Sequence, residues 1–237
     1  NDNCGSTQIS NICDFVSNSN NNSKIFDLGV SFDGDGDRAI FIDENCKIYD
    51  GDSMVFLLSK HLLKTTEYNK TSVGTLMTNY GIRNLYKNMN INFIETEVGD
   101  KNVFNEIKKH NAMLGGESSG HIIINNNNFS IGDGIISLLH VIEMLITDNK
   151  NLSCYGETIK MMPSKLLNIK VNDKNLTLSN EDNKKLINQM NEIIKDKGRL
   201  LIRASGTEDV IRVLIEHIDT KQLDYLLNYF CDKMKKY

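Results

Sequence analysis

The order of apolar and polar positions divides the first two thirds of the chain into short segments of two kinds. Some are brief apolar runs typical of strands, and others carry apolar residues three or four positions apart, as amphipathic helices do. We expect Asp52 to cap one of these helices and Asp133 to lie near the start of another. The expected strands are 28–32, 39–42, 73–78 and 91–96, and the expected helices are 8–17, 53–62, 82–89, 103–110 and 135–146. Such alternation over about 100 residues predicts an α/β layer domain with a parallel or mixed sheet.

The pattern changes after Pro163, the only proline of the chain. The last third is expected to hold strands at 166–171, 199–203 and 211–216 and helices at 181–196 and 221–235. This β-α-β-β-α order predicts a small α+β domain in which helices cover one face of an antiparallel sheet. A further boundary at Asp50–Asp52 divides the chain into the segments 1–49, 50–160 and 161–237.

Composition narrows the possible functions. Of the 237 residues, 40% are hydrophobic and 24% are charged, which is enough apolar material for a sizeable core. A net charge of -4 and a pI of about 5.8 argue against a nucleic-acid partner. No apolar run approaches the roughly 20 residues that cross a membrane, so we expect no membrane partner. The five cysteines are scattered without the paired spacing of metal sites, which predicts reduced thiols and a cytoplasmic location.

An acidic stretch, DGDGDR at 33–38, lies between the first two expected strands. Carboxylates about 4 Å apart repel one another by about 4 kcal/mol at an effective dielectric constant of about 20, so they need a counter-charge or raised pKa values. A hard divalent cation with oxygen ligands meets that need, and a site with room for water and a phosphate oxygen suits Mg²⁺. An EF-hand is excluded because Arg38 stands where its loop requires glycine. A solvated acidic turn is the alternative that remains.

A glycine-rich stretch, GGESSGH at 115–121, places polar side chains between residues that let a ligand approach the backbone. In an extended segment Glu117, Ser119 and His121 share one face, where they suit the hydroxyls of a sugar. Residues 116–120 also fit the G-x-S-x-G pattern of serine hydrolases, but that pattern requires a helix directly after it, and β-rich residues follow here. A plain glycine turn is a further alternative.

A third polar stretch, RASGTE at 203–208, joins the last two expected strands. An arginine, two hydroxyls and a glycine on one turn can surround a phosphate group with side-chain and backbone donors. A hairpin turn that merely carries polar residues is the alternative. Lys101, on the loop after Val98 and Gly99, is by default a solvated lysine.

Taken in order, these three stretches resemble the motifs of the α-D-phosphohexomutase superfamily, and within it the phosphoglucosamine mutase branch. Residues 1–7 and 98–100 are similar to that branch as well, so the resemblance covers nearly the whole chain. The chain departs from the branch at Lys101, Ser118 and Asp209, where the branch usually has Arg, Gln and Pro. By this resemblance, 1–49 are the tail of domain II, 50–160 are domain III and 161–237 are domain IV.

The resemblance implies a role for each candidate residue. Arg38 would lie beside a phosphoserine, and Lys101 and His121 would transfer a proton or contact phosphate. Glu117 and Ser119 would bind sugar hydroxyls. The implied ligands of Mg²⁺ are Asp33, Asp35 and Asp37, and the implied ligands of the distal phosphate are Arg203, Ser205, Gly206 and Thr207.

The reaction that the resemblance implies is the conversion of glucosamine 6-phosphate to glucosamine 1-phosphate through a bisphosphorylated sugar, towards UDP-N-acetylglucosamine and cell-wall precursors. Phosphomannomutase or phosphoglucomutase activity is one alternative, and non-catalytic binding of a phosphorylated hexose or hexosamine is another. The superfamily's reactive serine lies in a Ser-His-Asn-Pro-like setting in its first domain, and this sequence contains no such stretch. We therefore expect a fragment that needs an N-terminal domain with the phosphoserine as its partner and that is inactive alone.

Overall fold

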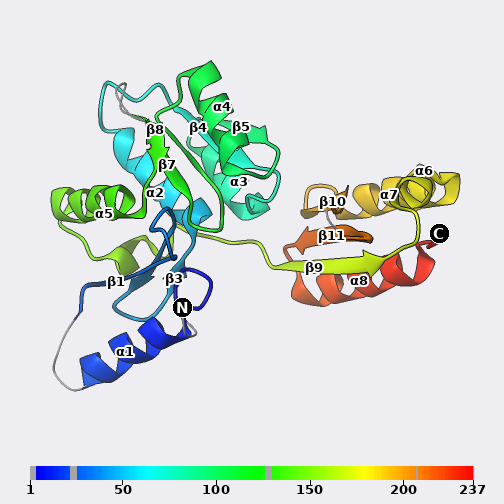
Figure 1. The fold of residues 1–237 in the computed structure, drawn as a ribbon, viewed down its shortest axis with the longest axis horizontal. Coiled ribbons are helices and arrows are strands. Elements are labelled where there is room, and N and C mark those ends of the chain that lie inside the picture. The colour runs from blue at the N-terminus through cyan, green and yellow to red at the C-terminus, as the bar shows by residue number, and fades with distance from the viewer. Residues whose placement is uncertain (1–3, 22–25, 126–129, 207, 237) are drawn as a thin grey trace. The chain divides into compact units, whose positions relative to one another are not determined.

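The computed structural model describes residues 4–21, 26–125, 130–206 and 208–236. The chain forms two compact units, residues 1–160 (unit 1) and residues 161–237 (unit 2), and each is described by itself (Figure 1). None of the described helices is long and apolar enough to cross a bilayer.

Unit 1 begins with α1 (Ser10–Asn21), which packs against the first strand of a small antiparallel sheet. In that sheet β1 (Leu28–Phe32) pairs with β2 (Ala39–Asp43), and β2 pairs with β3 (Ile48–Tyr49). The two strands predicted on either side of the acidic stretch are confirmed. The helix predicted at 8–17 exists but lies further along the chain, and the short strand β3 was not predicted.

The rest of unit 1 is built on a five-stranded mixed sheet with helices, which confirms the α/β layer prediction (Figure 1). Its strand order is β5-β4-β6-β7-β8, with β4 parallel to both β5 and β6 and with antiparallel pairing from β6 to β8. The strands are β4 (Thr71–Thr75), β5 (Asn92–Thr96), β6 (Leu114–Gly116), β7 (Ile122–Asn125) and β8 (Ser130–Gly132).

Helices cover both faces of this sheet because its strands carry apolar residues on both sides. The helix α4 packs on one face, where Val73 of β4 and Ile123 of β7 contact Val103 and Ile107 of the helix. The larger core lies with the other helices and includes Phe56, Tyr86 and Met144. The helices are α2 (Gly51–Leu62), α3 (Tyr80–Asn88), α4 (Asp100–His110) and α5 (Gly134–Asp148), and the 3-10 helix η1 (Leu152–Tyr155) follows.

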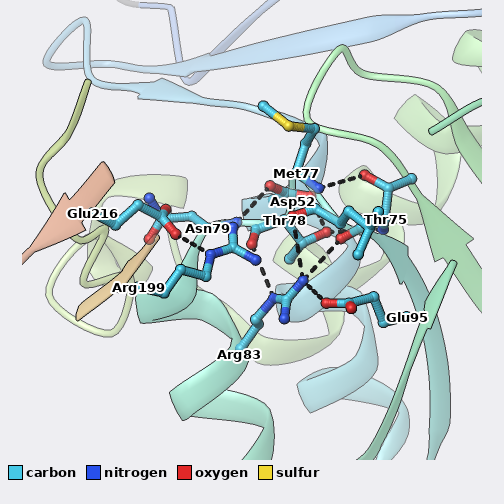
Figure 2. Close-up of polar contacts among 10 residues, drawn as sticks. Asp52, Thr75, Met77, Thr78, Asn79, Arg83, Glu95, Arg199 and Glu216 are labelled. Carbon is cyan, nitrogen blue, oxygen red and sulfur yellow. Dashed lines mark hydrogen bonds and ion pairs between the residues drawn. The ribbon is translucent and has the colours of Figure 1, made fainter. Parts of the chain in front are cut away.

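The start of α2 corrects one expectation from the sequence. The helix is capped by Asp50, whose side chain accepts a hydrogen bond from the Ser53 backbone at 2.9 Å, and not by Asp52. Asp52 lies in the first turn, buried, and accepts hydrogen bonds from the Thr78 hydroxyl at 3.0 Å and the Asn79 backbone at 3.2 Å (Figure 2). The carboxylate of Asp52 therefore ties α2 to the turn between β4 and α3. Asp133 was predicted only to lie near the start of α5, and in the structure it is the residue that caps this helix.

The same turn shortens the strand predicted at 73–78. β4 ends at Thr75, whose backbone N–H donates to the Thr78 hydroxyl at 3.2 Å. Arg83 of α3 then donates to the carbonyl oxygens of Thr78 and Thr75 at 3.1 and 3.3 Å and forms an ion pair with Glu95 (Figure 2). A guanidinium with several fixed donors suits this crowded turn.

Unit 2 is an antiparallel sheet of order β10-β11-β9 with helices on one face, as predicted (Figure 1). Alternate strand residues such as Ile169, Val213 and Ile215 pack with Met190 and Phe230 of the helices. A short helix, α6, was not predicted. The elements are β9 (Ser164–Lys170), α6 (Lys174–Ser179), α7 (Glu181–Ile194), β10 (Gly198–Ala204), β11 (Val210–His217) and α8 (Thr220–Lys233).

The end of α5 gives a prediction on stability. Asp148 accepts hydrogen bonds from Lys64 of the chain after α2 and, at 2.7 Å, from Tyr155 of η1. Burial alone would raise the pKa of Asp148, but these two hydrogen bonds outweigh it and lower the pKa from 3.8 to about 2. The carboxylate therefore stabilises the folded chain fully above the ordinary pKa, and this contribution is lost as pH falls through the folded value.

We expect Asp148→Asn to lower the free energy of unfolding at pH 7 by about 1 kcal/mol, a modest value because Lys64 is exposed and water screens the pair. The difference from the unaltered chain should shrink between about pH 5 and pH 2 in urea unfolding curves. Glu143→Gln, on the same helix and exposed, is the control and should change stability little at any pH. A penalty for Asp148→Asn that does not change with pH would contradict the assignment.

Candidate active site

The acidic stretch forms a tight loop because β1 and β2 pair up to its ends, with Phe32 opposite Ala39. Gly36 adopts a φ of 75°, a conformation that favours glycine. One oxygen atom from each of Asp33, Asp35 and Asp37 lies within 4.8 Å of the others. Opposite oxygen ligands of an octahedral Mg²⁺ are about 4 Å apart, so small side-chain movements would let all three carboxylates contact one ion. The residues present thus fit the metal predicted from the sequence.

Arg38 neutralises part of this charge. Its backbone N–H donates to Asp33 at 3.1 Å, and its Nε atom lies 3.5 Å from Asp33 and 3.8 Å from Asp37. Burial, the hydrogen bond with Asp33 and the negative charge of Asp33 raise the pKa of Asp37. Burial would also raise the pKa of Asp33, but hydrogen bonds from Arg38 and Asp37 lower it. The carboxylates affect one another as expected for a cluster that needs a cation.

Backbone hydrogen bonds join the acidic loop to the glycine-rich loop between β6 and β7. Arg38 and His121 form an isolated antiparallel bridge, and the Ala39 N–H donates to the Gly120 carbonyl at 3.0 Å. His121 is buried, and its Nδ1 atom lies 3.1 Å from a carboxylate oxygen of Asp37. The two loops, which are far apart in the sequence, therefore form one site.

Gly132 of β8 is a site residue that the sequence did not reveal. A Cβ atom at this position would lie 1.9 Å from Nε2 of His121, so only glycine leaves room for the imidazole ring. The next glycine, Gly134, donates its N–H to the Gly36 carbonyl at 2.9 Å and so joins the start of α5 to the acidic loop. The only signal in the sequence is the glycine pair around Asp133, which is easily taken for the start of a helix.

A cleft of about 340 Å³ opens beside the acidic loop. Asp37, His121 and Lys101 all line it, so the structure places the three candidates around one hollow. Lys101 lies in the first turn of α4 and is exposed. The other lining residues are Asp100, Phe104, Ile123 and Gly132.

The glycine-rich loop is fixed from two further directions. The Gly99 N–H, just before α4, donates to one carboxylate oxygen of Glu117 at 2.9 Å. The Gly51 N–H, at the start of α2, donates to the Ser118 carbonyl at 3.3 Å, and a Cβ atom on Gly51 would lie 2.0 Å from the Glu117 carbonyl oxygen. Ser119 is exposed at the tip of this loop. The strand β7 follows the loop, so the structure lacks the helix that a serine-hydrolase elbow needs there.

The third polar stretch lies in unit 2 as the turn between β10 and β11. Ser205 is buried, its N–H donates to the Val210 carbonyl at 2.9 Å, and its hydroxyl accepts a hydrogen bond from the Glu208 N–H at 3.3 Å. Gly206 has open space around the position of a Cβ atom. Arg203 lies opposite Arg212 in the strand register, and Arg212 donates to Glu208 at 3.1 Å. Thr207, a predicted phosphate ligand, lies outside the described residues.

Two family models match the chain. The model "Phosphoglucomutase/phosphomannomutase, alpha/beta/alpha domain III" matches residues 50–161, and the model "Phosphoglucomutase/phosphomannomutase, C-terminal domain" matches residues 166–233. The chain belongs to this phosphohexomutase family, as the motifs of the sequence predicted.

Among curated relatives the chain is similar to phosphoglucosamine mutases. It is 38% identical to that of Anoxybacillus flavithermus over 217 residues, which cover 91% of this chain and 47% of the relative. It is 40% identical to that of Ligilactobacillus salivarius, with 84% of this chain and 45% of the relative covered. The chain thus spans about half the length of the curated relatives it matches.

A solved structure shows the same fold. Aspergillus fumigatus N-acetylphosphoglucosamine mutase, in complex with GlcNAc-6P and magnesium, aligns with a TM-score of 0.74 at 20% identity. The alignment covers 98% of this chain and 52% of that one.

The geometry of the acidic loop predicts how the chain responds to Mg²⁺. We expect the unaltered chain to bind Mg²⁺ weakly and Asp35→Asn to weaken binding at least about tenfold, or about 1.4 kcal/mol, because one of three anionic ligands is lost. Calorimetric or NMR titration with MgCl₂ measures this. Asp27→Asn changes an exposed carboxylate just before β1 and should have no effect. Equal responses of Asp35→Asn and the unaltered chain would show that the loop is only a solvated turn.

Proposed function

We propose that the chain is the carboxyl-terminal part of a phosphoglucosamine mutase, which interconverts glucosamine 6-phosphate and glucosamine 1-phosphate through a bisphosphorylated sugar. The observation that carries this proposal is the cleft of unit 1, where Asp37, Lys101 and His121 meet beside the cluster of three carboxylates. The curated relatives at 38% and 40% identity, both phosphoglucosamine mutases, favour the amino sugar as substrate. In this proposal residues 1–49 are the tail of domain II, and 50–160 and 161–237 are domains III and IV.

Charge neutralisation and positioning are what phosphoryl transfer needs from a protein. Mg²⁺ held by Asp33, Asp35 and Asp37 would neutralise negative charge on the phosphoryl group. Arg38, at the end of that loop, adds a fixed positive charge beside it.

The cleft also provides groups that can move a proton. His121 is oriented by Asp37 through Nδ1, and such a pair can accept and return the proton of a sugar hydroxyl. Lys101 lines the same cleft and can donate to a phosphate oxygen or take part in the proton transfer.

Sugar recognition falls to the glycine-rich loop. One oxygen of the Glu117 carboxylate accepts from Gly99, so the carboxylate is held in place while its other oxygen can accept from a sugar hydroxyl. Ser119, exposed at the tip, offers a second polar contact. The distal phosphate is assigned to the turn of unit 2, through Arg203, Ser205, Gly206 and Thr207.

The phosphate assignment can be tested by substitution. We expect Arg203→Ala to weaken binding of glucosamine 6-phosphate by about 1.5–3 kcal/mol, the scale of charge-assisted hydrogen bonds. Calorimetry with the sugar phosphate and with unphosphorylated glucosamine separates phosphate from sugar recognition. Lys185→Ala, an exposed lysine of α7, is the matched loss of charge and should leave affinity unchanged. A folded Arg203→Ala chain with unaltered affinity would mean that the turn is only a polar hairpin.

The partner in this proposal is an amino-terminal half that carries the phosphoserine. The sequence has no Ser-His-Asn-Pro-like stretch, and without that serine there is no covalent carrier for the phosphoryl group. A cytoplasmic location belongs to the same proposal and rests on the scattered cysteines. Non-catalytic binding of a phosphosugar is the second candidate function, because the same missing serine favours it.

An apolar surface of unit 1 suits this partner. Ile135, Leu139 and Ile146 of α5 are 60%, 60% and 73% exposed. A hollow of about 670 Å³ between α5 and β1 continues this surface, with Leu28 and Val30 among its lining residues. Exposed apolar area of this kind marks an interaction surface, and the amino-terminal half is the occupant we propose because the chain spans only about half of its relatives.

Mutase activity, measured for the chain alone and together with the amino-terminal half, separates the mutase proposal from non-catalytic binding of a phosphosugar. We expect no mutase turnover from the chain with Mg²⁺ and bisphosphorylated sugar, and turnover after co-expression with the amino-terminal half of the Anoxybacillus flavithermus enzyme. Leu139→Lys should prevent the gain, while Ile193→Lys, at a similarly exposed apolar position of α7, should not. Turnover of about 1–10³ s⁻¹ by the chain alone would refute the assignment of its serines to binding. Mannose and glucose 1-phosphates in the same assay test the phosphomannomutase and phosphoglucomutase alternatives.

A further inference from the structure

Lys174, the first residue of α6, reaches the turn between β10 and β11 from a distant part of the sequence. Its ammonium group donates to the carbonyl oxygen of Ser205 at 3.0 Å and to that of Glu208 at 2.9 Å. The carboxylate of Asp209 lies 3.6 Å away. One half-buried cation therefore holds both sides of the 205–208 turn.

The contact with the Ser205 carbonyl fixes the direction of the peptide group between Ser205 and Gly206. In a trans peptide the carbonyl and the following N–H point in opposite directions, and the described backbone has no cis bond. Because the Ser205 carbonyl points to Lys174, the N–H of Gly206 points away from it. A Cβ atom on Gly206 would have open space around it, so no neighbour on that side of the residue hinders an anion that approaches the turn.

The hydroxyl of Ser205 is oriented by the same turn. Its oxygen accepts a hydrogen bond from the Glu208 N–H, so its own proton is left to donate. Lys174 also binds the carbonyl of Glu208, so the lysine and the Ser205 hydroxyl contact the same residue of the turn. The Gly206 N–H is thus oriented directly by Lys174 through the Ser205–Gly206 peptide, and the Ser205 hydroxyl belongs to the same turn that the lysine binds.

We propose that Lys174 is a positioning residue for recognition of a phosphate monoester: it binds the carbonyl groups of the 205–208 turn and so presents the Gly206 and Ser205 donors to the phosphate. This inference rests on the proposed function, because it assumes that the turn binds the phosphate of a sugar. It differs from a direct role, since the ammonium is engaged by carbonyl oxygens on the turn itself.

The test compares Lys174→Met, which keeps the alkyl stem and loses the donors, with Lys174→Arg, which restores donors. Lys170→Met, an exposed lysine opposite Val210 in the strand register, is the matched control. Binding of glucosamine 6-phosphate is measured by calorimetry, and the Gly206 amide is followed by NMR. Lys174→Gln replaces the methionine variant if that variant does not fold.

We expect Lys174→Met to weaken binding about tenfold, Lys174→Arg to recover most of it, and Lys170→Met to leave it unchanged. In Lys174→Met the Gly206 amide signal should be displaced before ligand is added and should respond less to it. The loss should persist in about 1 M NaCl, where a through-space attraction by the ammonium would be screened within about 3 Å.

Unchanged affinity of Lys174→Met, or an equal loss in Lys170→Met, would overturn the inference. A loss that disappears in high salt would also overturn it, because it would show a general charge effect. If the unaltered chain binds glucosamine 6-phosphate and Arg203→Ala does not, while Lys174→Met binds normally, only this inference fails. If neither the unaltered chain nor Arg203→Ala binds glucosamine 6-phosphate, the proposed function and this inference both fail.

Discussion

The site of unit 1 depends on the close approach of two backbone segments, the end of the acidic loop and the end of the glycine-rich loop. The Arg38–His121 bridge and the hydrogen bond from Ala39 to Gly120 bring the carboxylates and the imidazole together without any side chain between them. This approach requires glycine at position 120, because a Cβ atom on Gly120 would lie 2.6 Å from the Ala39 carbonyl oxygen. The charge cluster is thus assembled by main-chain geometry, and Arg38 then moderates its repulsion.

Much of the fold of unit 1 was predictable because it is encoded in local patterns of apolar and polar residues. Alternating strand and helix patterns gave the mixed sheet, and the acidic run between two apolar segments gave the loop between β1 and β2. The motif residues could be recognised individually. Their convergence in one cleft could not be read from spacing, because Asp37, Lys101 and His121 belong to different elements of unit 1.

The features that sequence reasoning missed depend on partners far along the chain. Asp52 looked like a cap because it precedes a helix, but its carboxylate binds the Thr78 turn, 26 residues away, and Asp50 caps instead. Lys174 was not singled out in the sequence, because its contacts lie 31 and 34 residues away. Helix α6 was missed because a six-residue helix shows too little periodicity to be recognised.

The position of Gly132 against His121 has a consequence for attempts to make the protein more robust. Replacing a glycine inside a strand is a common stabilising strategy, since it reduces the conformational freedom of the unfolded chain. Here even a single methyl group would occupy the space of the Nε2 atom of the imidazole. Residue 132 must therefore remain glycine, which weakens strand β8 at this position. The larger loss of conformational entropy when this glycine folds is a cost of keeping the histidine beside Asp37.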